Sequence, residues 1–467
     1  MTLDPAFSSA ISSDRNVLNM FYDTLVRQDA DGEFVPALAE DWEQDGDTLR
    51  FFLREGVTFH DGTDFDAEAA VANLTRVMDP ENGNTKAAAL AKVEEVTAEG
   101  EHILELTLSE PDPILLVNLA HEAGMMASPS SLEADSLDRE PVGTGPFTLS
   151  SWRSNVNLVA EANPDYWRTD DEGEALPRLG QVTFDFVTDP STLRANLSAG
   201  QVDMVRVLPP EEYLQLEENP QVTFEDTGVR RSYYISINQE EGVFENPQAR
   251  EALSLAVDRE GIGEAAASGE YDISPSFATE FDWFFDESIQ VPEHDPERAA
   301  ELIEEAGLEG EEVSILVRRR DPDPTIAELV QSELNQTGLS ASVEVLEFES
   351  LLDQMNEGDY DAAVMVIDVP RLDPSLTFDP YLVTGAPNNW GGISSDELDD
   401  LLAEGTRIEG ESERAEIYSE VQRSIGDNND LVFLHQPTAP LIHDVDLQGL
   451  VFNVDGQWRL DEAWFES

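Results

Sequence analysis

The sequence predicts an α/β protein in which helices cover a mixed β-sheet. Over the 467-residue chain, short apolar runs typical of strands alternate with longer amphipathic stretches typical of helices. Hydrophobic residues make up 40% of the chain, including 21 Phe, 9 Tyr and 7 Trp. This content excludes a disordered acidic protein and is enough to fill the cores of two or three compact domains.

The N-terminal region predicts a helix followed by several strands. Apolar residues recur at helical spacing over residues 17–26, a turn follows at 28–32, and a strand begins at Phe34. Residues 48–54 and 103–108 have the β-strand pattern. We therefore expect a helix, a turn and then strands in this part of the chain.

Two helices have clear end signals in the sequence. Asp66 is placed to cap a helix over residues 67–78, because an Asp side chain accepts hydrogen bonds from the free N–H groups of a first turn. A helix over 191–199 is expected to end at Gly200, which adopts a left-handed conformation easily. The apolar face of the first helix is Ala70, Val71, Leu74 and Val77.

The remaining strands and helices alternate along the chain, which is typical of layered α/β proteins. We expect strands at 182–186, 202–207, 233–237, 313–317, 343–346 and 362–367, and helices at 247–258, 296–306, 324–336 and 349–356.

The charge of the chain is extreme. Asp and Glu number 99 against 26 Lys and Arg, which gives a net charge of −73, and Lys86 and Lys92 are the only lysines. Such a charge repels itself in dilute buffer, whereas at molar salt the Debye length falls to about 3 Å and the repulsion is screened. The composition predicts a halophile's protein, and its sign disfavours nucleic acid or an anionic membrane surface as a partner.

The sequence lacks the common signatures of catalysis and metal binding. It has no cysteine, no phosphate-binding loop, no nucleophile elbow and no zinc-protease motif. Its six histidines form no close cluster, and we expect no metal site and no cofactor. No apolar run is long enough to span a membrane, and residues 1–5 do not resemble a signal peptide. Either the protein is cytosolic or its leader has been removed.

A resemblance becomes specific when several segments are read in order. They are "LDPAF" (3–7), "VPALAEDW" (35–42), "LREGVTFHDGTDFDAEAAVANL" (53–74), "PVGTGPF" (141–147), "ANPDYW" (162–167), "LSAGQVDMV" (197–205), "INQ" (237–239), "AREALSLAVDREGI" (249–262), "HDPERAAELIEEAGL" (294–308) and "ISSDELDDLL" (393–402). Together they resemble the successive blocks of family 5 of the extracellular solute-binding proteins, the peptide- and nickel-binding receptors of ABC importers. The resemblance spans essentially the whole chain.

This resemblance implies a two-lobed periplasmic-binding-protein fold, also called a venus-flytrap fold, with an extra subdomain in lobe one. Lobe one would comprise residues 1–230, with the subdomain at 43–140, and would include residues 433–467; lobe two would comprise 236–432. The implied protein is a monomeric receptor without enzymatic activity that captures small peptides or other carboxylate-bearing solutes by lobe closure. Its partners would be an ABC permease and ATPase, and a lipid anchor on its leader would hold it at the outer face of the cytoplasmic membrane.

The resemblance also nominates ligand-binding residues. In dipeptide-binding relatives an Arg in an R-x-x-x-P pattern holds the ligand's carboxylate, and Arg318 fits that spacing ahead of Pro322. The other reading of Arg318 is a surface pair with an acidic residue. The Asp that holds the free amino group of peptides is replaced here by Pro370, and Asp368 is the nearest substitute. The full candidate set is Arg318, Asp368, Arg371, Trp283, Phe285 and Trp390.

Other interpretations remain open. The missing acidic anchor is compatible with a nickel-chelate, other metal-chelate or opine-like receptor, and a hydrolase that uses two carboxylates is a less favoured third reading. The glycines of the 143–146 segment are expected to serve a turn, and residues 163–167 a turn with aromatic packing, so both segments are assigned structural roles.

The charge leads to a first prediction. Because charge repulsion is screened only at high ionic strength, the protein is expected to loosen or unfold in dilute buffer and to melt at a higher temperature in molar salt. Circular-dichroism melts at both salt concentrations check this. An unchanged melting temperature would show that the acidic surface carries no salt requirement.

Overall fold

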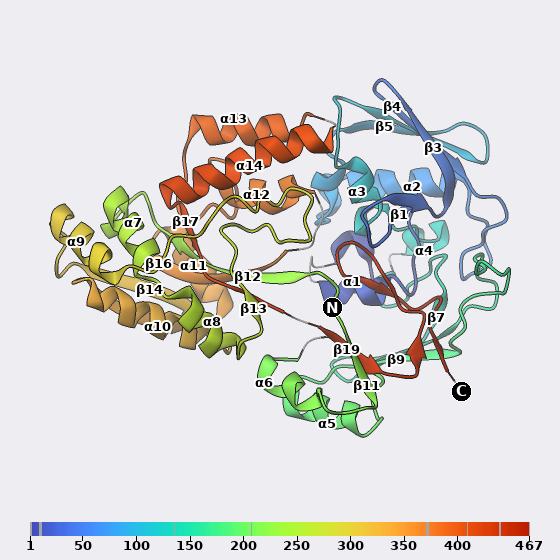
Figure 1. The fold of residues 1–467 in the computed structure, drawn as a ribbon. Helices are drawn as coiled ribbons and strands as arrows, with labels where there is room; N and C mark the ends of the chain where they lie inside the picture. The colour runs from blue at the N-terminus through green and yellow to red at the C-terminus, as the bar shows by residue number, and fades with distance from the viewer. Residues whose placement is uncertain are drawn as a thin grey trace. The chain divides into compact units, whose positions relative to one another are not determined.

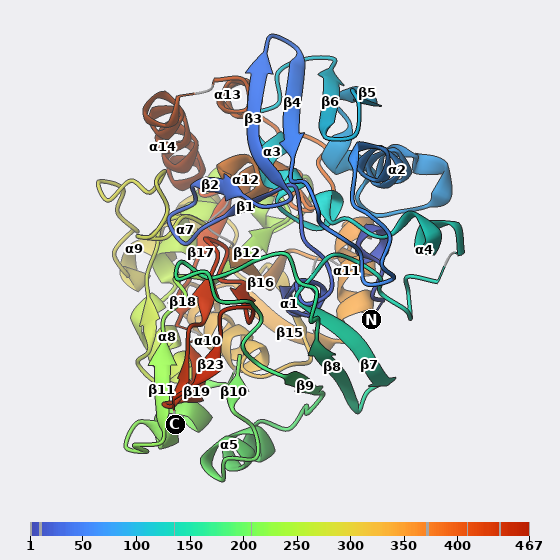
Figure 2. The same cartoon turned by 90° about the vertical axis from the view of Figure 1, so that its right-hand side faces the viewer.

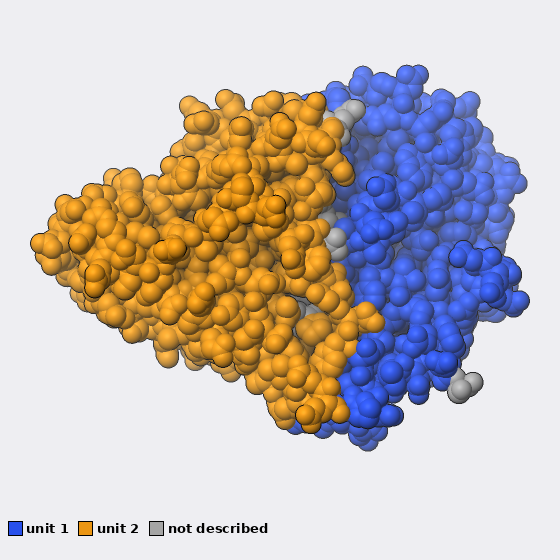
Figure 3. Space-filling view, viewed as in Figure 1, with its two compact units in different colours: residues 1–205, 219–223, 442–467 blue, residues 206–218, 224–441 orange. Residues whose placement is uncertain are grey.

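The computed structural model describes residues 2–8, 12–134, 136–206, 208–369, 373–408, 410–438 and 440–466. The chain divides into two compact units, coloured separately in Figure 3. Unit 1 comprises residues 1–205, 219–223 and 442–467, and unit 2 comprises residues 206–218 and 224–441. Each unit has its own sheets and its own hydrophobic core.

Unit 1 contains a four-stranded antiparallel sheet with helix α2 packed against two of its strands (Figure 2). In β4 and β6 every second residue is buried, so one face of the sheet carries the core and the other meets water. The strand order is β3 (Ala39–Asp45), β4 (Thr48–Leu53), β6 (Ile103–Leu108) and β5 (Val93–Ala98). A second antiparallel sheet joins β7 (Phe147–Arg153), β8 (Asn157–Ala162) and β9 (Gln181–Asp185).

Helix α2 (Ala67–Met78) has the predicted ends. Its N-cap Asp66 accepts a hydrogen bond from the backbone N–H of Ala69 at 2.8 Å. Of the predicted apolar face, Ala70, Leu74 and Val77 are buried, and Val71 is partly buried against the same core. Asp66 therefore fixes where the helix starts, and its apolar stripe fixes which side faces the sheet.

The predicted helix over residues 17–26 is largely wrong. Helix α1 (Ser12–Leu18) ends early, and the chain then forms a hairpin of β1 (Val26–Gln28) and β2 (Phe34–Pro36). The carbonyl of Met20 accepts a hydrogen bond from the N–H of Phe147 at 2.9 Å, and that of Phe21 accepts one from Gly145 at 3.0 Å. These long-range bonds use acceptors that a continuing helix would have needed.

The sequence suggested that Gly143 and Gly145 form a turn. The structure shows that they are needed because two backbone segments approach closely at these positions. Neither has a positive φ. A Cβ atom on Gly143 would lie 2.2 Å from the carbonyl oxygen of Phe21, and one on Gly145 would lie 2.5 Å from the carbonyl carbon of Phe21. Only glycine lets the two backbones approach this closely.

A buried carboxylate, Asp23, collects donors from three distant segments of unit 1. It accepts hydrogen bonds from Thr144 Oγ1 at 3.2 Å, Tyr166 Oη at 3.3 Å, Trp167 Nε1 at 2.9 Å and Arg459 Nη2 at 3.0 Å. The side chain of Asp23 is fully buried and that of Arg459 almost so. The structural role expected for residues 143–146 and 163–167 is thus confirmed.

Arg459 extends this network into the C-terminal segment. Its Nε donates to Asp461 Oδ1 at 3.3 Å, Asp461 also pairs with Arg168, and Arg168 Nη2 donates to Glu462 at 2.9 Å. Breaking a buried ion pair by removing one partner is costly because the other charge stays buried without compensation.

Unit 2 is built on a five-stranded mixed sheet in the order β15-β14-β16-β12-β17. Figure 1 labels β14, β16, β12 and β17, and Figure 2 labels β15. Strands β15, β14 and β16 are parallel, and β12 is antiparallel to both of its neighbours. The bounds are β15 (Ser340–Leu346), β14 (Glu312–Arg318), β16 (Ala362–Val369), β12 (Arg230–Ile237) and β17 (Leu431–Phe433). The mixed sheet predicted from the alternating pattern is confirmed.

Helices cover both faces of this sheet, which explains why its strands read as nearly continuous apolar runs. One face packs against α7 (Pro247–Ala256), α8 (Arg259–Ala267), α9 (Pro296–Ala306) and α10 (Asp323–Gln336). The other packs against α11 (Phe348–Glu357), α12 (Pro374–Leu382), α13 (Asp396–Gly405) and α14 (Glu411–Asn428). The elements expected between residues 313 and 367 are all found, with ends shifted by a few residues.

Smaller elements complete the chain. They are α3 (Leu115–Leu119), α4 (Pro129–Ala134), α5 (Pro190–Ser198), α6 (Pro210–Tyr213), β10 (Met204–Val205), β11 (Val222–Glu225), β13 (Tyr271–Asp272), β18 (Gln436–Pro437), β19 (Leu441–Asp444), β20 (Leu447–Gln448), β21 (Val451–Phe452), β22 (Trp458–Arg459) and β23 (Trp464–Phe465). Helix α5 is followed by the expected left-handed Gly200. Among the described residues, no helix combines the length and the apolar character needed to cross a bilayer.

The Asp23 network leads to a second prediction. Replacing Arg459→Met is expected to lower the free energy of unfolding by roughly 3–5 kcal/mol, because Asp23 and Asp461 would remain buried without this partner. The matched control is Arg298→Met on α9, since Arg298 pairs with Glu305 at an exposed site, where ion pairs contribute about 0–1 kcal/mol. Urea unfolding at constant molar salt measures both. Equal effects of the two variants would contradict the structural role of the network.

Candidate ligand-binding site

The topology of unit 2 gathers charged residues at one edge of its sheet. Strands β14 and β16 end at this edge and β12 begins there, because β12 runs antiparallel to β16. Arg318 is the last residue of β14, and Arg231 of β12 lies directly opposite Asp368 of β16. The carboxyl ends of parallel strands are the common position for ligand sites in open α/β sheets.

Arg318 is held in place by a buried carboxylate. Its Nε donates to Oδ2 of Asp323, the first residue of α10, and the hydroxyl of Tyr233 donates to the other oxygen of Asp323 at 3.1 Å. Asp323 is 1% exposed. Within the described chain, no side chain accepts a hydrogen bond from the two Nη atoms of Arg318, so the end of the guanidinium is available to a ligand.

Positive charge exceeds negative charge around Arg318. Arg231 pairs with Asp368 at 2.9 Å, and Arg318 pairs with Asp323. Arg320 makes no side-chain hydrogen bond or ion pair to any residue that the structure describes. Partial burial, together with the positive charges of Arg231 and Arg318, lowers the pKa of Arg320. Three guanidinium groups therefore share two carboxylates, and an anion would relieve their mutual repulsion.

Arg319 lies between these residues in sequence but behaves differently. Its Nε donates to Glu347 at 3.1 Å and its Nη2 to the carbonyl of Val345 at 3.2 Å. Its side chain is 64% exposed, whereas that of Arg318 is 20% exposed. The surface-pair interpretation thus describes Arg319, which makes it a matched control for Arg318.

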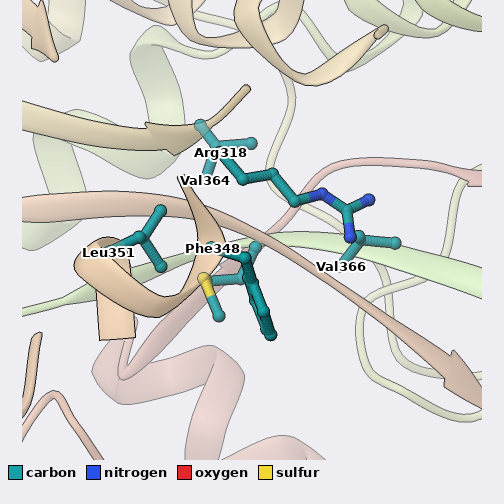
Figure 4. Close-up of a pocket in the computed structure, with 6 residues that line it drawn as sticks. Arg318, Phe348, Leu351, Val364 and Val366 are labelled. Atoms are coloured by element: carbon teal, nitrogen blue, oxygen red, sulfur yellow. The ribbon is translucent and has the colours of Figure 1, made fainter. Parts of the chain in front are cut away.

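A small hollow adjoins Arg318 (Figure 4). The side chain of Arg318 extends from the end of β14 toward Val366 and away from Leu351. The hollow has a volume of about 10 Å³, which is room for about one water molecule. Its lining residues are Arg318, Phe348, Leu351, Val364, Met365 and Val366.

The aromatic candidates lie against other parts of unit 2. Phe285 and Trp390 pack on the core beneath α11–α14, and Trp390 Nε1 donates to Asn356 at 3.0 Å. Trp283 is 37% exposed and stacks over Arg414 at 5.4 Å. None of the described contacts joins these aromatics to Arg318. Arg371 lies outside the described residues. Of the candidate set, Arg318 and Asp368 lie at the same edge of the sheet, each paired with a different residue.

Sequence reasoning missed four members of the cluster: Arg231, Arg320, Asp323 and Tyr233. Arg231 belongs to an Arg-Arg pair ahead of a strand, which is conspicuous in a chain with so few cations. Asp323 follows a proline and is the first residue of α10, where an acidic side chain is favoured by the helix dipole. Tyr233 carries no signal of its own, because its contact with Asp323 depends on the packing of α10 against the sheet.

A buried histidine lies behind Tyr233. The rings of His435 and Tyr233 stack at 4.9 Å with an interplanar angle of 7°. His435 is 1% exposed, and neither ring nitrogen has a hydrogen-bond partner. Burial lowers its pKa to about 4, so the ring is neutral at physiological pH. Among the described residues, no group of three His, Asp or Glu side chains could hold a metal ion.

The chain thus combines two compact units with an arginine cluster at the edge of the mixed sheet of unit 2. Residues 33–389 match the family model of the bacterial extracellular solute-binding proteins, family 5, and the chain belongs to this family. It is a solute-binding transport receptor and not an enzyme, as the sequence predicted.

Known proteins are similar over the whole chain. The glutathione-binding protein GsiB of Escherichia coli (strain K12) is 26% identical, with 99% of this chain and 91% of GsiB aligned. DppA of Helicobacter pylori, an ABC transporter-associated periplasmic binding protein solved with the peptide STSA, has a TM-score of 0.84 at 23% identity, covering 100% of this chain and 96% of DppA.

A third similar protein was solved with a different ligand. AgaA of A. tumefaciens R10, in complex with agropinic acid, has a TM-score of 0.81 at 23% identity, covering 100% of this chain and 96% of AgaA. These solved structures confirm the predicted α/β periplasmic-binding-protein fold.

His435 leads to a third prediction. The unfolded state binds a proton near pH 6.5 and the folded state only near pH 4, so the free energy of unfolding falls as the pH drops through this window. The contribution is on the order of 2–3 kcal/mol at pH 4.5. His435→Phe, which keeps an aromatic ring against Tyr233, is expected to lose less stability between pH 7 and 4.5 than the parent.

Denaturant unfolding at constant salt measures this difference, with the exposed His294→Phe as the control. If His435→Phe and the parent lose stability in parallel, His435 is not a neutral, buried group.

Proposed function

We propose that this protein is the receptor of an ABC importer and captures small peptides or related solutes that bear a carboxylate. The observation that carries the proposal is the cluster of Arg231, Arg318 and Arg320, which holds more positive than negative charge in a chain of net charge −73. Cations are scarce here, and most arginines are occupied by acidic partners. The glutathione and peptide ligands named for GsiB and DppA agree with this chemistry.

Arg318 would bind the carboxylate through its two terminal nitrogens. Asp323 accepts a hydrogen bond from Nε of Arg318, and the hydroxyl of Tyr233 donates one to Asp323. The guanidinium of Arg318 is therefore oriented before the ligand binds. A planar guanidinium matches a carboxylate with two parallel hydrogen bonds, and pre-orientation reduces the entropy lost on binding. Arg320 adds a second positive charge that no described side chain neutralises.

Asp368 would hold the amino group of the same ligand. Its Oδ1 accepts from Arg231, and the side chain remains 45% exposed, so it can accept a further hydrogen bond. In this role it takes the place of the acidic anchor that is absent at Pro370. The proximity of Arg231 makes Asp368 a weaker anchor than an unpaired carboxylate, because the two charges already compensate each other.

The two compact units would act as the two lobes, unit 1 as lobe one with its subdomain at 43–140, and unit 2 as lobe two; the lobe bounds implied by the resemblance, 1–230 with 433–467 and 236–432, differ from the unit bounds by some tens of residues or fewer at each junction. A ligand that touches both lobes stabilises the closed state by its higher affinity for that state. A closed, loaded monomer would then dock on the permease and its ATPase. A lipid anchor on the leader would keep the receptor at the outer face of the cytoplasmic membrane.

This proposal leads to a fourth prediction. Arg318→Ala is expected to weaken peptide binding by about 30-fold or more, because a charge-assisted bidentate contact is lost. Arg319→Ala, its sequence neighbour, is expected to bind within about twofold of the parent. Isothermal titration calorimetry in molar KCl with di- and tripeptides measures both.

Because Arg318→Ala leaves Asp323 buried without its cation, the melting temperature of each variant must be recorded. Arg320→Ala provides an independent readout, since Arg320 makes no hydrogen bond or ion pair with a described side chain; it is expected to weaken binding severalfold with little change in the melting temperature. Unchanged affinity in both Arg318→Ala and Arg320→Ala would overturn the site.

A further inference from the structure

The hollow beside Arg318 has one charged wall and an otherwise apolar lining. Its floor consists of Leu351, Val364 and Met365, which are 0%, 1% and 6% exposed and belong to the cores of unit 2. Its rim includes Phe348, the first residue of α11. Figure 4 shows Phe348 and Arg318 on the same hollow, reached from β14 and from the start of α11.

Phe348 is unusually exposed for its type. It is 51% exposed, although 99 acidic residues supply abundant polar surface elsewhere. Among the large apolar side chains that the structure describes, only Val156 is equally exposed, at 51%. An exposed aromatic at the rim of a hollow that also contains a guanidinium is an amphipathic surface, suited to a ligand with a charged end beside an apolar group.

We infer that the solute carries an apolar side chain next to the carboxylate that Arg318 binds, and that this side chain packs against Phe348 and the hollow. This inference rests on the proposed function and deepens it by naming the substrate class: peptides or peptide-like acids whose last residue is apolar. In a peptide, the C-terminal side chain and the carboxylate leave the same carbon atom, so a carboxylate on Arg318 places that side chain at the hollow.

The size of the hollow sets how the side chain binds. A volume of about 10 Å³ accommodates a methyl-sized group and not a whole leucine or phenylalanine. Most of the side chain would therefore lie over the exposed ring of Phe348, removing apolar surface of both partners from water. An acidic side chain at the same place would lose hydration against apolar walls and gain no hydrogen bond from them.

The test compares di- and tripeptides that differ only in a C-terminal Leu, Gly or Asp, titrated into the full chain in molar KCl. The parent is expected to bind Leu-ended peptides about tenfold more tightly than Gly-ended ones, and Asp-ended peptides most weakly. In Phe348→Ala the Leu advantage is expected to fall to about twofold, while Gly-ended peptides bind as they do to the parent. Val156→Ala, which removes another apolar side chain that is 51% exposed, is the matched control and leaves all affinities unchanged.

The outcomes separate the two proposals. The apolar subsite is wrong if the parent binds Leu-, Gly- and Asp-ended peptides with equal affinity, or if Phe348→Ala keeps the full preference for Leu-ended peptides. If Arg318→Ala abolishes binding in either case, the carboxylate site stands. If the parent binds none of the peptides, the peptide-receptor function fails and the subsite fails with it. Because Phe348 is exposed, Phe348→Ala is expected to fold, and its melting temperature confirms this.

Discussion

Buried pairs between a carboxylate and an arginine organise both units. In unit 1, Asp23 accepts hydrogen bonds from Arg459 and from the side chains of Thr144, Tyr166 and Trp167. It thereby connects the N-terminal segment to the loops at 143–146 and 163–167 and to the C-terminal segment. In unit 2, Asp323 binds Arg318 and Tyr233 at the edge of the central sheet. In a chain with 26 cations and 99 acids, cations are scarce, and several of the described arginines, among them Arg15, Arg414 and Arg459, are committed to buried pairs with carboxylates. An arginine cluster with surplus charge is therefore informative in this protein, whereas in a protein of balanced composition it would be ordinary.

Sequence reasoning succeeded where local signals decide the structure. Asp66 and its apolar stripe set the ends and face of α2, and the apolar runs of β14 and β16 marked strands covered on both faces. It failed over residues 17–26, although the apolar residues there do recur at helical spacing. The carbonyl of Phe21 accepts a hydrogen bond from Gly145, and that of Met20 accepts one from Phe147, so these carbonyls are not used in a helix. Arg318 could be nominated through the resemblance. Its partners could not, because the pairing of Arg231 with Asp368 depends on the register of β12 and β16, and the contact of Tyr233 with Asp323 depends on how α10 packs.

Capture of a solute, the proposed function of the site, requires binding and no catalytic step. A receptor must hold a solute firmly enough to close and weakly enough to release it, so a few oriented charges and a modest apolar contact are sufficient. Rigid elements supply the orientation here: Arg318 ends a central strand, Asp323 begins a helix, and Tyr233 lies within a strand that packs on buried His435. If the protein works in molar salt, as its charge predicts, long-range attraction is screened, and short-range contacts made by Arg318 and Phe348 would decide which solutes are captured.

Native mass spectrometry of protein purified from its source in high salt tests the central claim most directly, because it identifies whatever solute the receptor holds. The account predicts a co-purifying small molecule with a free carboxylate, of a mass consistent with a short peptide or peptide-like acid, present in the parent and absent from Arg318→Ala that has been prepared in the same way. A bound metal chelate, or a solute without a carboxylate that remains in Arg318→Ala, would contradict it.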